Sequence, residues 1–241
     1  MGVRKVAEPR IVAMGGGGFS MESTTALDDY LLGLTGSPHP KVCFVATASA
    51  DNDAYINRFY RAFRYPRAIA THLPLFQRDG SDIEATLLAQ DLVYVSGGNT
   101  VNLLAIWRAH GVDRAMRRAW EAGVLLCGLS AGSLCWFEGG VTDSYGGDLA
   151  ALPDGLGFVP GSHCPHYDGE PQRRPTYRRL VAAGELPPGI AADDGVGLLY
   201  VGTELREVVT SRPGAQAYRV DAAGETPIPA RLLSPAPPGP R

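Results

Sequence analysis

The first 137 residues alternate between short apolar segments of strand length and longer amphipathic segments of helix length. Buried strands are predicted at 10–18, 41–49, 68–76, 91–100 and 124–130, and helices at 51–65, 81–90, 100–111 and 113–123. Parallel strands need a long crossover, usually a helix, so this alternation predicts a doubly wound, mostly parallel sheet with helices on both faces. The fold class is therefore α/β, in three layers.

Local signals set the expected limits of several elements. Pro74 cannot donate to a neighbouring strand, which places the strand at 68–76 near an edge of the sheet. The expected helix caps are Asp51 or Asn52 for the first helix, Ser81 with Glu84 as a capping box for the second and Asp113 for the fourth, with Gly111 and Gly123 as helix ends.

The second half of the chain has a different pattern. Residues 139–165 are rich in Gly, Asp and Pro and predict loops with short strands, followed by a helix at 173–184. Three closely spaced strands at 196–202, 205–211 and 215–220 predict a C-terminal β meander that completes the sheet or packs beside it. No linker or repeat divides the chain, so we expect one catalytic domain over 1–241, with a proline-rich, frayed tail at 234–241.

Composition excludes several classes of protein. The net charge is −3 and basic residues are scattered, so no nucleic-acid partner is expected. No apolar run is long enough for a membrane helix, and the first ten residues lack the apolar core of a signal peptide. The four cysteines form no CxxC pair and are expected to be reduced and mostly buried. The sequence thus predicts a cytoplasmic protein, and it leaves a homo-oligomer open.

The segment "GLSAG" at 128–132 carries the main chemical signal, because a predicted strand precedes it and a helix follows. A sharp strand-to-helix turn exposes a serine hydroxyl above the carboxyl edge of the sheet. Ser130 is therefore the expected nucleophile, and the Ala131 amide, aided by the helix dipole, is an expected oxyanion donor. The alternative is that Ser130 is only a small turn residue.

A serine nucleophile needs a base and an acid that orients it. His163 and His166 lie in "GSHCPHYDGE", downstream of the serine, and His166 is preferred because Pro165 stiffens its loop. Between the serine and the histidine we favour Asp143 as the acid and keep Glu138 as the alternative. Asp168 and Glu170, beside His166, could instead serve as the acid or bind a substrate amine.

Two glycine clusters, "GGGG" at 15–18 and "GGNT" at 97–100, follow predicted strands and so lie at the same edge as Ser130. Gly98 is expected to supply a second oxyanion amide. A nucleotide-binding role for the first cluster is disfavoured, because Ser20 stands where the dinucleotide motif needs a glycine and no P-loop lysine follows.

"GGNT" with a Leu-rich helix, then "GLSAGS", then "CPHYDGE" resembles the peptidase E family of aspartyl dipeptidases, relatives of cyanophycinase. The resemblance covers about residues 20–220. It implies a fold like that of class I glutamine amidotransferases, with Ser130 as nucleophile, His166 as base and Gly98 with Ala131 as the oxyanion hole. It also makes an α/β-hydrolase less favoured, since that fold usually separates serine and histidine by more than these 36 positions.

The resulting hypothesis is a serine exopeptidase that cleaves dipeptides or very short peptides and needs no metal or organic cofactor. The resemblance adds a preference for N-terminal aspartate, which would require a cation such as Arg173 or Arg174. The expected substrate-binding residues are Asn99, Asp168, Glu170 and Arg173. The alternatives are a cyanophycinase-like isopeptidase or esterase, and a non-catalytic amidotransferase-like protein that binds a ligand.

Overall fold

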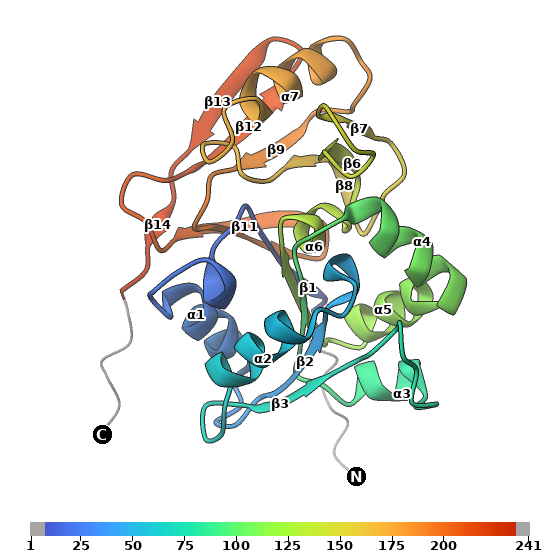
Figure 1. Cartoon of the computed structure of the whole chain (residues 1–241). Coiled ribbons are helices and arrows are strands. Elements are labelled where there is room, and N and C mark those ends of the chain that lie inside the picture. Colours follow the sequence, from blue (N-terminus) through green and yellow to red (C-terminus); the bar gives the residue numbers. More distant parts are fainter. Residues whose placement is uncertain (1–7, 235–241) are drawn as a thin grey trace.

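The computed structural model describes residues 8–234, which form two β-sheets and the helices around them (Figure 1). The first sheet has eight strands in the order β14-β11-β10-β1-β5-β4-β2-β3. Its strands are β1 (Arg10–Met14), β2 (Lys41–Val45), β3 (Ile69–His72), β4 (Leu92–Val95), β5 (Leu125–Leu129), β10 (Val196–Val201), β11 (Glu204–Thr210) and β14 (Arg231–Leu232).

The five strands predicted in the first half pair in parallel in the order β1-β5-β4-β2-β3. The strand that contains Ile69 lies at the edge, as the proline after it predicted. Strands β4 and β5 are buried along their whole length because helices cover both faces of this sheet. The carboxyl ends of β1, β4 and β5 therefore meet at one edge, which is where the glycine clusters and Ser130 lie.

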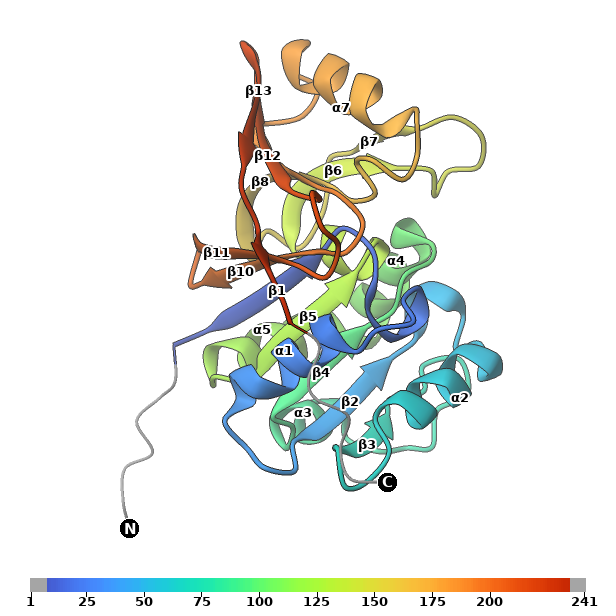
Figure 2. The ribbon, with the colours of Figure 1, turned by 90° about the vertical axis from the view of Figure 1, so that its left-hand side faces the viewer.

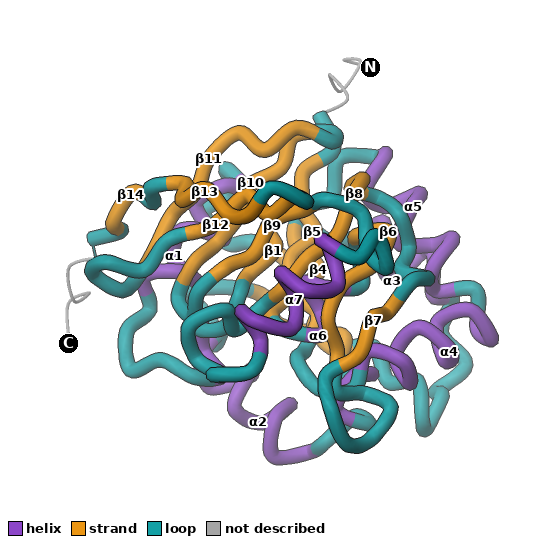
Figure 3. The backbone as a smooth tube through the Cα atoms, turned by 90° about the horizontal axis from the view of Figure 1, so that it is seen from above, coloured by secondary structure: helices purple, strands orange, loops and turns teal. Residues whose placement is uncertain are grey.

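The two faces of the first sheet are packed by different helices, which lie on opposite sides of the strands (Figure 3). One face packs against α1 (Ala26–Thr35) and α2 (Asp53–Ala62), with an aromatic cluster that includes Phe44 and Phe59, whose ring centroids are 4.7 Å apart. The other face packs against α3 (Ile83–Leu88), α4 (Thr100–His110) and α5 (Val112–Glu121), whose Trp107 and Met116 are fully buried. The expected mixed α/β fold is confirmed.

The C-terminal strands differ from the predicted meander, because they divide between two sheets. Strands β10 and β11 are antiparallel neighbours that extend the first sheet beyond β1. The next strand, β12 (Ala217–Asp221), pairs instead with β9 (Gly189–Ala192) and β13 (Gly224–Ile228) in a second sheet. At the start of the β9–β12 pairing, the buried Asp193 carboxylate accepts a hydrogen bond from the Gln216 amide at 3.0 Å, which helps to hold β12 to the second sheet.

The second sheet has the order β13-β12-β9-β8-β6-β7 and includes β6 (Phe137–Thr142), β7 (Ala150–Leu152) and β8 (Val159–Cys164). It lies above the first sheet in Figure 2, with α7 (Arg173–Ala182) packed against it. Ile190 and Ala217 of the second sheet belong to the same hydrophobic core as Val95 and Leu126 of the first. The two sheets are therefore packed together around one continuous core.

The helix limits confirm some of the local expectations, at Asn52 and Gly111, and correct others. Asn52 is the cap of α2, and Asp82 rather than Ser81 caps α3 through the Ala85 amide, so the expected capping box does not form. Gly111 adopts a left-handed conformation that ends α4, and Asp113 lies inside the first turn of α5 rather than before it. The helix after Ser130, α6 (Ala131–Leu134), is a single turn, so the expected dipole contribution there is small.

Helix α1 was not among the predicted elements. Residues 235–241, most of the expected frayed tail, lie outside the described residues. Over residues 8–234, no helix combines the length and the apolar character needed to cross a membrane.

Candidate active site

Ser130 stands at a strained turn between β5 and α6. Its backbone has φ 53° and ψ −116°, a conformation that a residue with a side chain adopts at a cost. The glycines on either side are required by packing: a Cβ on Gly128 would lie 2.2 Å from the Gly132 carbonyl oxygen, and one on Gly132 would lie 2.5 Å from that of Val95. The G-x-S-x-G pattern thus reflects close backbone approaches that present the Ser130 side chain at the edge of the sheet.

The carbonyl of Ser130 is held by three donors. The Ser133 hydroxyl donates to it at 2.8 Å, and the amides of Ser133 and Leu134 donate at 3.0 and 2.9 Å. His163 lies behind this turn, with Nε2 3.2 Å from Ser133 Oγ and Nδ1 2.8 Å from the Ile190 carbonyl oxygen. Burial lowers the pKa of His163 to about 4, so this histidine is neutral and packs as part of the core.

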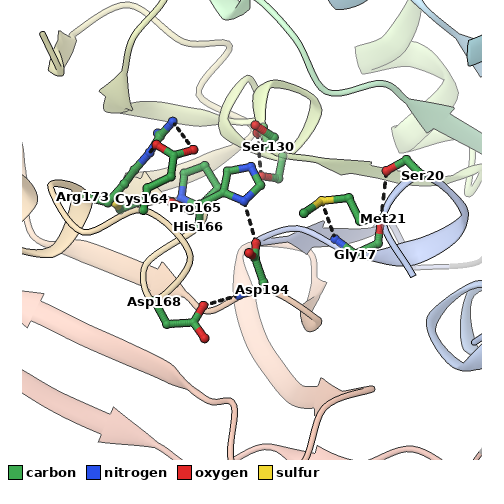
Figure 4. A network of polar contacts seen from close by, with 12 residues as sticks. Gly17, Ser20, Met21, Ser130, Cys164, Pro165, His166, Asp168, Arg173 and Asp194 are labelled. Carbon is green, nitrogen blue, oxygen red and sulfur yellow. Dashed lines mark hydrogen bonds and ion pairs between the residues drawn. The ribbon is translucent and has the colours of Figure 1, made fainter. Parts of the chain in front are cut away.

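His166 follows β8 and Pro165 and has a positive φ of 55°. Its amide donates to the Gly15 carbonyl at 3.2 Å, which ties the histidine loop to the end of β1. Its Nδ1 lies 2.6 Å from Oδ1 of Asp194, and the two side chains are only 12% and 20% exposed. The imidazole lies between Ser130 and Asp194, with its other nitrogen on the Ser130 side (Figure 4).

Asp194 lies in the short connection between β9 and β10. Its amide donates to Oδ1 of Asp168 at 2.8 Å, and its carbonyl accepts from Nη1 of Arg212 at 3.0 Å. Burial alone would raise the pKa of Asp194, but the hydrogen bond from His166 and the nearby positive charges outweigh it and lower the pKa. A Cβ on Gly16 or on Gly169 would lie about 2 Å from an Asp194 carboxylate oxygen, at 2.1 and 2.2 Å, so both neighbours must be glycine.

The expected acids do not occupy this position. Asp143 is exposed in the loop between β6 and β7, and Glu138 accepts a hydrogen bond from the Gly161 amide at 2.7 Å, between β6 and β8. The carboxylate on His166 comes instead from Asp194, 28 positions after the histidine. The correction has a topological reason: the chain returns to the first sheet through β10, beside β1, and so brings residue 194 next to Gly16.

A sequence signal for Asp194 existed but was weak. The paired acids in "AADDGVG" stand between two apolar strands, where a turn is expected in any case. Nothing in the spacing distinguishes Asp194 from its neighbour Asp193, whose carboxylate binds the Gln216 amide instead.

The expected oxyanion donors belong to the turn after β4 and to the residue after Ser130. Gly98 has φ 137°, and a Cβ there would lie 2.1 Å from the Ala48 carbonyl oxygen, so its amide orientation depends on glycine. The Ala131 amide opens α6, directly after the serine. Among residues 8–234 no hydrogen-bond acceptor is found for either amide. Gly98 also lines the cavity that contains Ser130.

Ser130 and His166 line the same cavity, whose volume is about 430 Å³. Gly97, Gly98 and Leu129 form its floor at the ends of β4 and β5. The rest of the wall comes from the loop after β1 and from α2 and the residue before it, namely Ser20, Met21, Asn52, Ala54, Tyr55 and Arg58. Sequence reasoning did not identify this wall, because these residues form no motif and lie 72 or more positions before the serine.

The four expected substrate-binding residues have other partners. Asn99 caps α4 through the Asn102 amide and donates to the Ser144 carbonyl. Asp168 accepts from the Asp194 amide and pairs with Arg212, while Glu170 pairs with Arg173. Arg173 is 4% exposed and also donates to the Val141 carbonyl, so it is a buried support for the second sheet. None of the four lines the cavity around Ser130.

The cysteines confirm the expectation that they are buried: Cys43, Cys127, Cys135 and Cys164 are all free thiols in the interior. Within residues 8–234, no three His, Cys, Asp or Glu side chains are grouped in an arrangement that could hold a metal ion.

Comparison with known proteins shows the family to which this chain belongs. The sequence model of peptidase family S51 matches residues 11–208. The uncharacterized peptidase YgaJ of Bacillus subtilis is 48% identical over 229 residues, which cover 93% of this chain and 99% of that protein. The uncharacterized peptidase Lin0382 of Listeria innocua is 28% identical over 149 residues, which cover 58% of this chain and 70% of that protein.

Two solved structures have a similar fold. A peptidase from an acI-B1 actinobacterium superposes with a TM-score of 0.68 at 18% identity, over 93% of this chain and 96% of that one. A putative peptidase E protein from Listeria monocytogenes superposes with a TM-score of 0.61 at 20% identity, over 86% of this chain and 99% of that one.

Proposed function

Because this chain belongs to peptidase family S51, we propose that it is a serine peptidase that hydrolyses dipeptides or very short peptides at the first peptide bond. The observation that carries the proposal is that Ser130 and His166 line one cavity, with Asp194 behind the histidine, 2.6 Å from its Nδ1. The strained serine turn and the family membership support the same conclusion.

In the proposed reaction, Ser130 Oγ attacks the carbonyl carbon of the peptide bond while Nε2 of His166 takes the hydroxyl proton. Asp194 holds Nδ1–H, which fixes the tautomer that leaves Nε2 free to accept, and its charge stabilises the imidazolium that forms. His166 then gives the proton to the leaving amine. Water attacks the resulting acyl-enzyme by the same steps, with His166 as base, and releases the acid and free Ser130.

The negative oxygen of the tetrahedral intermediate is assigned to the amides of Gly98 and Ala131. Each such donor is worth about a hundredfold or more in kcat, because it acts where charge develops and needs no reorganisation. The turn at Gly98 supports this role, since its position against Ala48 fixes the direction of the amide before substrate binds.

The size of the cavity supports a small substrate. A volume of about 430 Å³ lies at the lower end of the range for small-molecule sites, roughly 300–1,000 Å³. The loop after β1 and helix α2 wall it on one side and the His166 loop on another, so we expect long peptides and folded proteins to be poor substrates.

A panel of dipeptides that vary in the first residue tests the proposal, together with casein as a long substrate. Ser130→Ala should lose at least about a thousandfold in kcat while remaining folded, because only binding and oxyanion terms remain. A serine-directed phosphonate should label the wild type at Ser130 and fail to label Ser130→Ala.

The outcomes separate the alternatives. Cleavage of β-aspartyl isopeptides or esters in preference to every dipeptide would replace the dipeptidase assignment with a related hydrolase. Efficient cleavage of casein would show an endopeptidase that uses the same residues. Unchanged turnover in Ser130→Ala would end the serine mechanism, and tight dipeptide binding with no turnover would indicate a ligand-binding protein.

A further inference from the structure

The side chains that line the cavity include an arginine but no acidic residue among residues 8–234. Within that described part of the chain, the one guanidinium in the lining is that of Arg58. The two acids that could have bound an amine are engaged elsewhere: Asp168 with Arg212, and Glu170 with Arg173. A site with this lining attracts a negative group and offers no counterion to a positive one.

Arg58 is held at the wall of the cavity by a single backbone contact. Its Nη1 donates to the Ser20 carbonyl at 2.8 Å, which joins α2 to the loop after β1. A guanidinium has five N–H donors, so most of its hydrogen-bonding capacity remains. The structure gives Arg58 no carboxylate partner among the described residues, whereas other arginines such as Arg67, Arg174 and Arg212 each pair with one.

Arg58 lies one turn after Tyr55 on α2, and both side chains line the cavity that contains Ser130. Ser20 and Gly97 line this cavity as well, and the Arg58 guanidinium is hydrogen-bonded to the Ser20 carbonyl. Gly97 in turn lies against the nucleophile, since a Cβ on it would lie 3.4 Å from Cβ of Ser130. Arg58 therefore lines the same cavity as the nucleophile.

We infer that Arg58 binds a carboxylate of the substrate and thereby selects which short peptides enter. This inference rests on the proposed function and adds the chemistry of recognition to it. A dipeptide can supply the carboxylate from two sources, its own C-terminus or an acidic side chain. A guanidinium recognises both through the same charge-assisted hydrogen bonds.

Binding measurements can separate the two sources without relying on turnover. Four ligands would be titrated calorimetrically into Ser130→Ala: Asp-Leu, Asn-Leu and the C-terminal amide of each. The same four would be titrated into Ser130→Ala combined with Arg58→Gln. Asn and the amide each remove one carboxylate with little change in shape, so each comparison is a double-mutant cycle between Arg58 and one carboxylate.

We expect Arg58→Gln to weaken binding by about tenfold for ligands with the recognised carboxylate. This is the lower end for a hydrogen bond to a charged group, since Arg58 is exposed. Removing that carboxylate should abolish the difference. Coupling to the C-terminal carboxylate identifies the peptide terminus as the source, and coupling to the aspartate identifies the side chain. Absence of coupling to both overturns the inference.

Arg61→Gln is the matched control, because Arg61 is an exposed arginine on the same helix that does not line the cavity. It changes the net charge by the same amount and should leave binding within about twofold, as expected for a screened surface charge. Arg58→Lys keeps the charge but loses the paired donors, and should recover part of the affinity.

The result also distinguishes this inference from the proposed function. If the wild type hydrolyses none of the dipeptides but Arg58 is coupled to a ligand carboxylate, the proposed function is wrong and the assignment of Arg58 as a carboxylate-binding residue is supported. If turnover is normal and Arg58→Gln changes neither affinity nor KM for any ligand, the enzyme stands and the assignment of Arg58 is wrong.

Discussion

Replacing Asp194 with asparagine should disable the proposed catalytic group while changing its shape very little. The Asp194 carboxylate lies 2.6 Å from His166 Nδ1, and both side chains are largely shielded from water. Asparagine keeps the volume that Gly16 and Gly169 leave for it. An amide N–H facing Nδ1 would favour the tautomer with the proton on Nε2, which cannot accept the proton of Ser130.

The size of the effect follows from two terms. A carboxylate about 4 Å from the centre of an imidazolium, at an effective dielectric constant near 20, stabilises it by about 4 kcal/mol. At 1.36 kcal/mol per factor of ten this is about a thousandfold in kcat, and the tautomer shift adds to it. We therefore expect Asp194→Asn to lose about a thousand- to ten-thousandfold in kcat, with KM changed by only a few fold.

The assay is steady-state hydrolysis of the best dipeptide from the panel, with thermal unfolding to confirm that each variant is folded. Asp193→Asn is the neighbouring control: its carboxylate binds the Gln216 amide, so the change should lower stability and spare kcat. Asp143→Asn and Glu138→Gln should both keep near-normal kcat. If Asp143→Asn or Glu138→Gln shows the large loss and Asp194→Asn does not, the assignment of the acid is refuted.

Three further changes test other parts of the structure. Burial raises the pKa of Asp28 from 3.8 to about 7, so the folded state holds a proton that the unfolded state releases. The free energy of unfolding should therefore fall as the pH rises from about 4 to 7, by up to about 4 kcal/mol from this group. Denaturant titrations of Asp28→Asn should not show this decrease, and parallel pH curves for the two proteins would disprove the role of Asp28. Gly98→Ala places a Cβ 2.1 Å from the Ala48 oxygen and should lower kcat at least about a hundredfold. The control Gly146→Ala, at a positive φ in open space, should affect only stability, and equal kcat in the two variants would contradict the oxyanion role of Gly98. Ser133→Ala removes the hydroxyl that donates to Ser130 and should lower kcat about fivefold with KM unchanged, and kinetics identical to wild type would mean that the backbone donors suffice.

The sequence by itself determined the parallel core and two residues of the candidate site. Strand and helix alternate visibly through residue 137 because each buried strand is apolar along its length and each crossover helix is amphipathic. Ser130 could be identified because the strand, the G-x-S-x-G pattern and the turn that follows are adjacent in sequence, although the contact that requires Gly132 is with Val95 of β4. His166 could be identified because Pro165, directly before it, marks a stiff loop in the sequence. The structure places Ser130 and His166 in the same cavity.

Tertiary structure alone decided the partners of these residues. The expected acids were sought near the serine in sequence, but Asp194 reaches His166 because β10 runs antiparallel beside β1 and returns the chain to Gly16. Arg58 reaches the cavity because α2 packs against the loop after β1, where Arg58 is hydrogen-bonded to the Ser20 carbonyl. Arg173 does not line the cavity because it is buried between α7 and the second sheet. Pairing between distant strands depends on which edges remain free after the core has formed, and no short stretch of sequence records that.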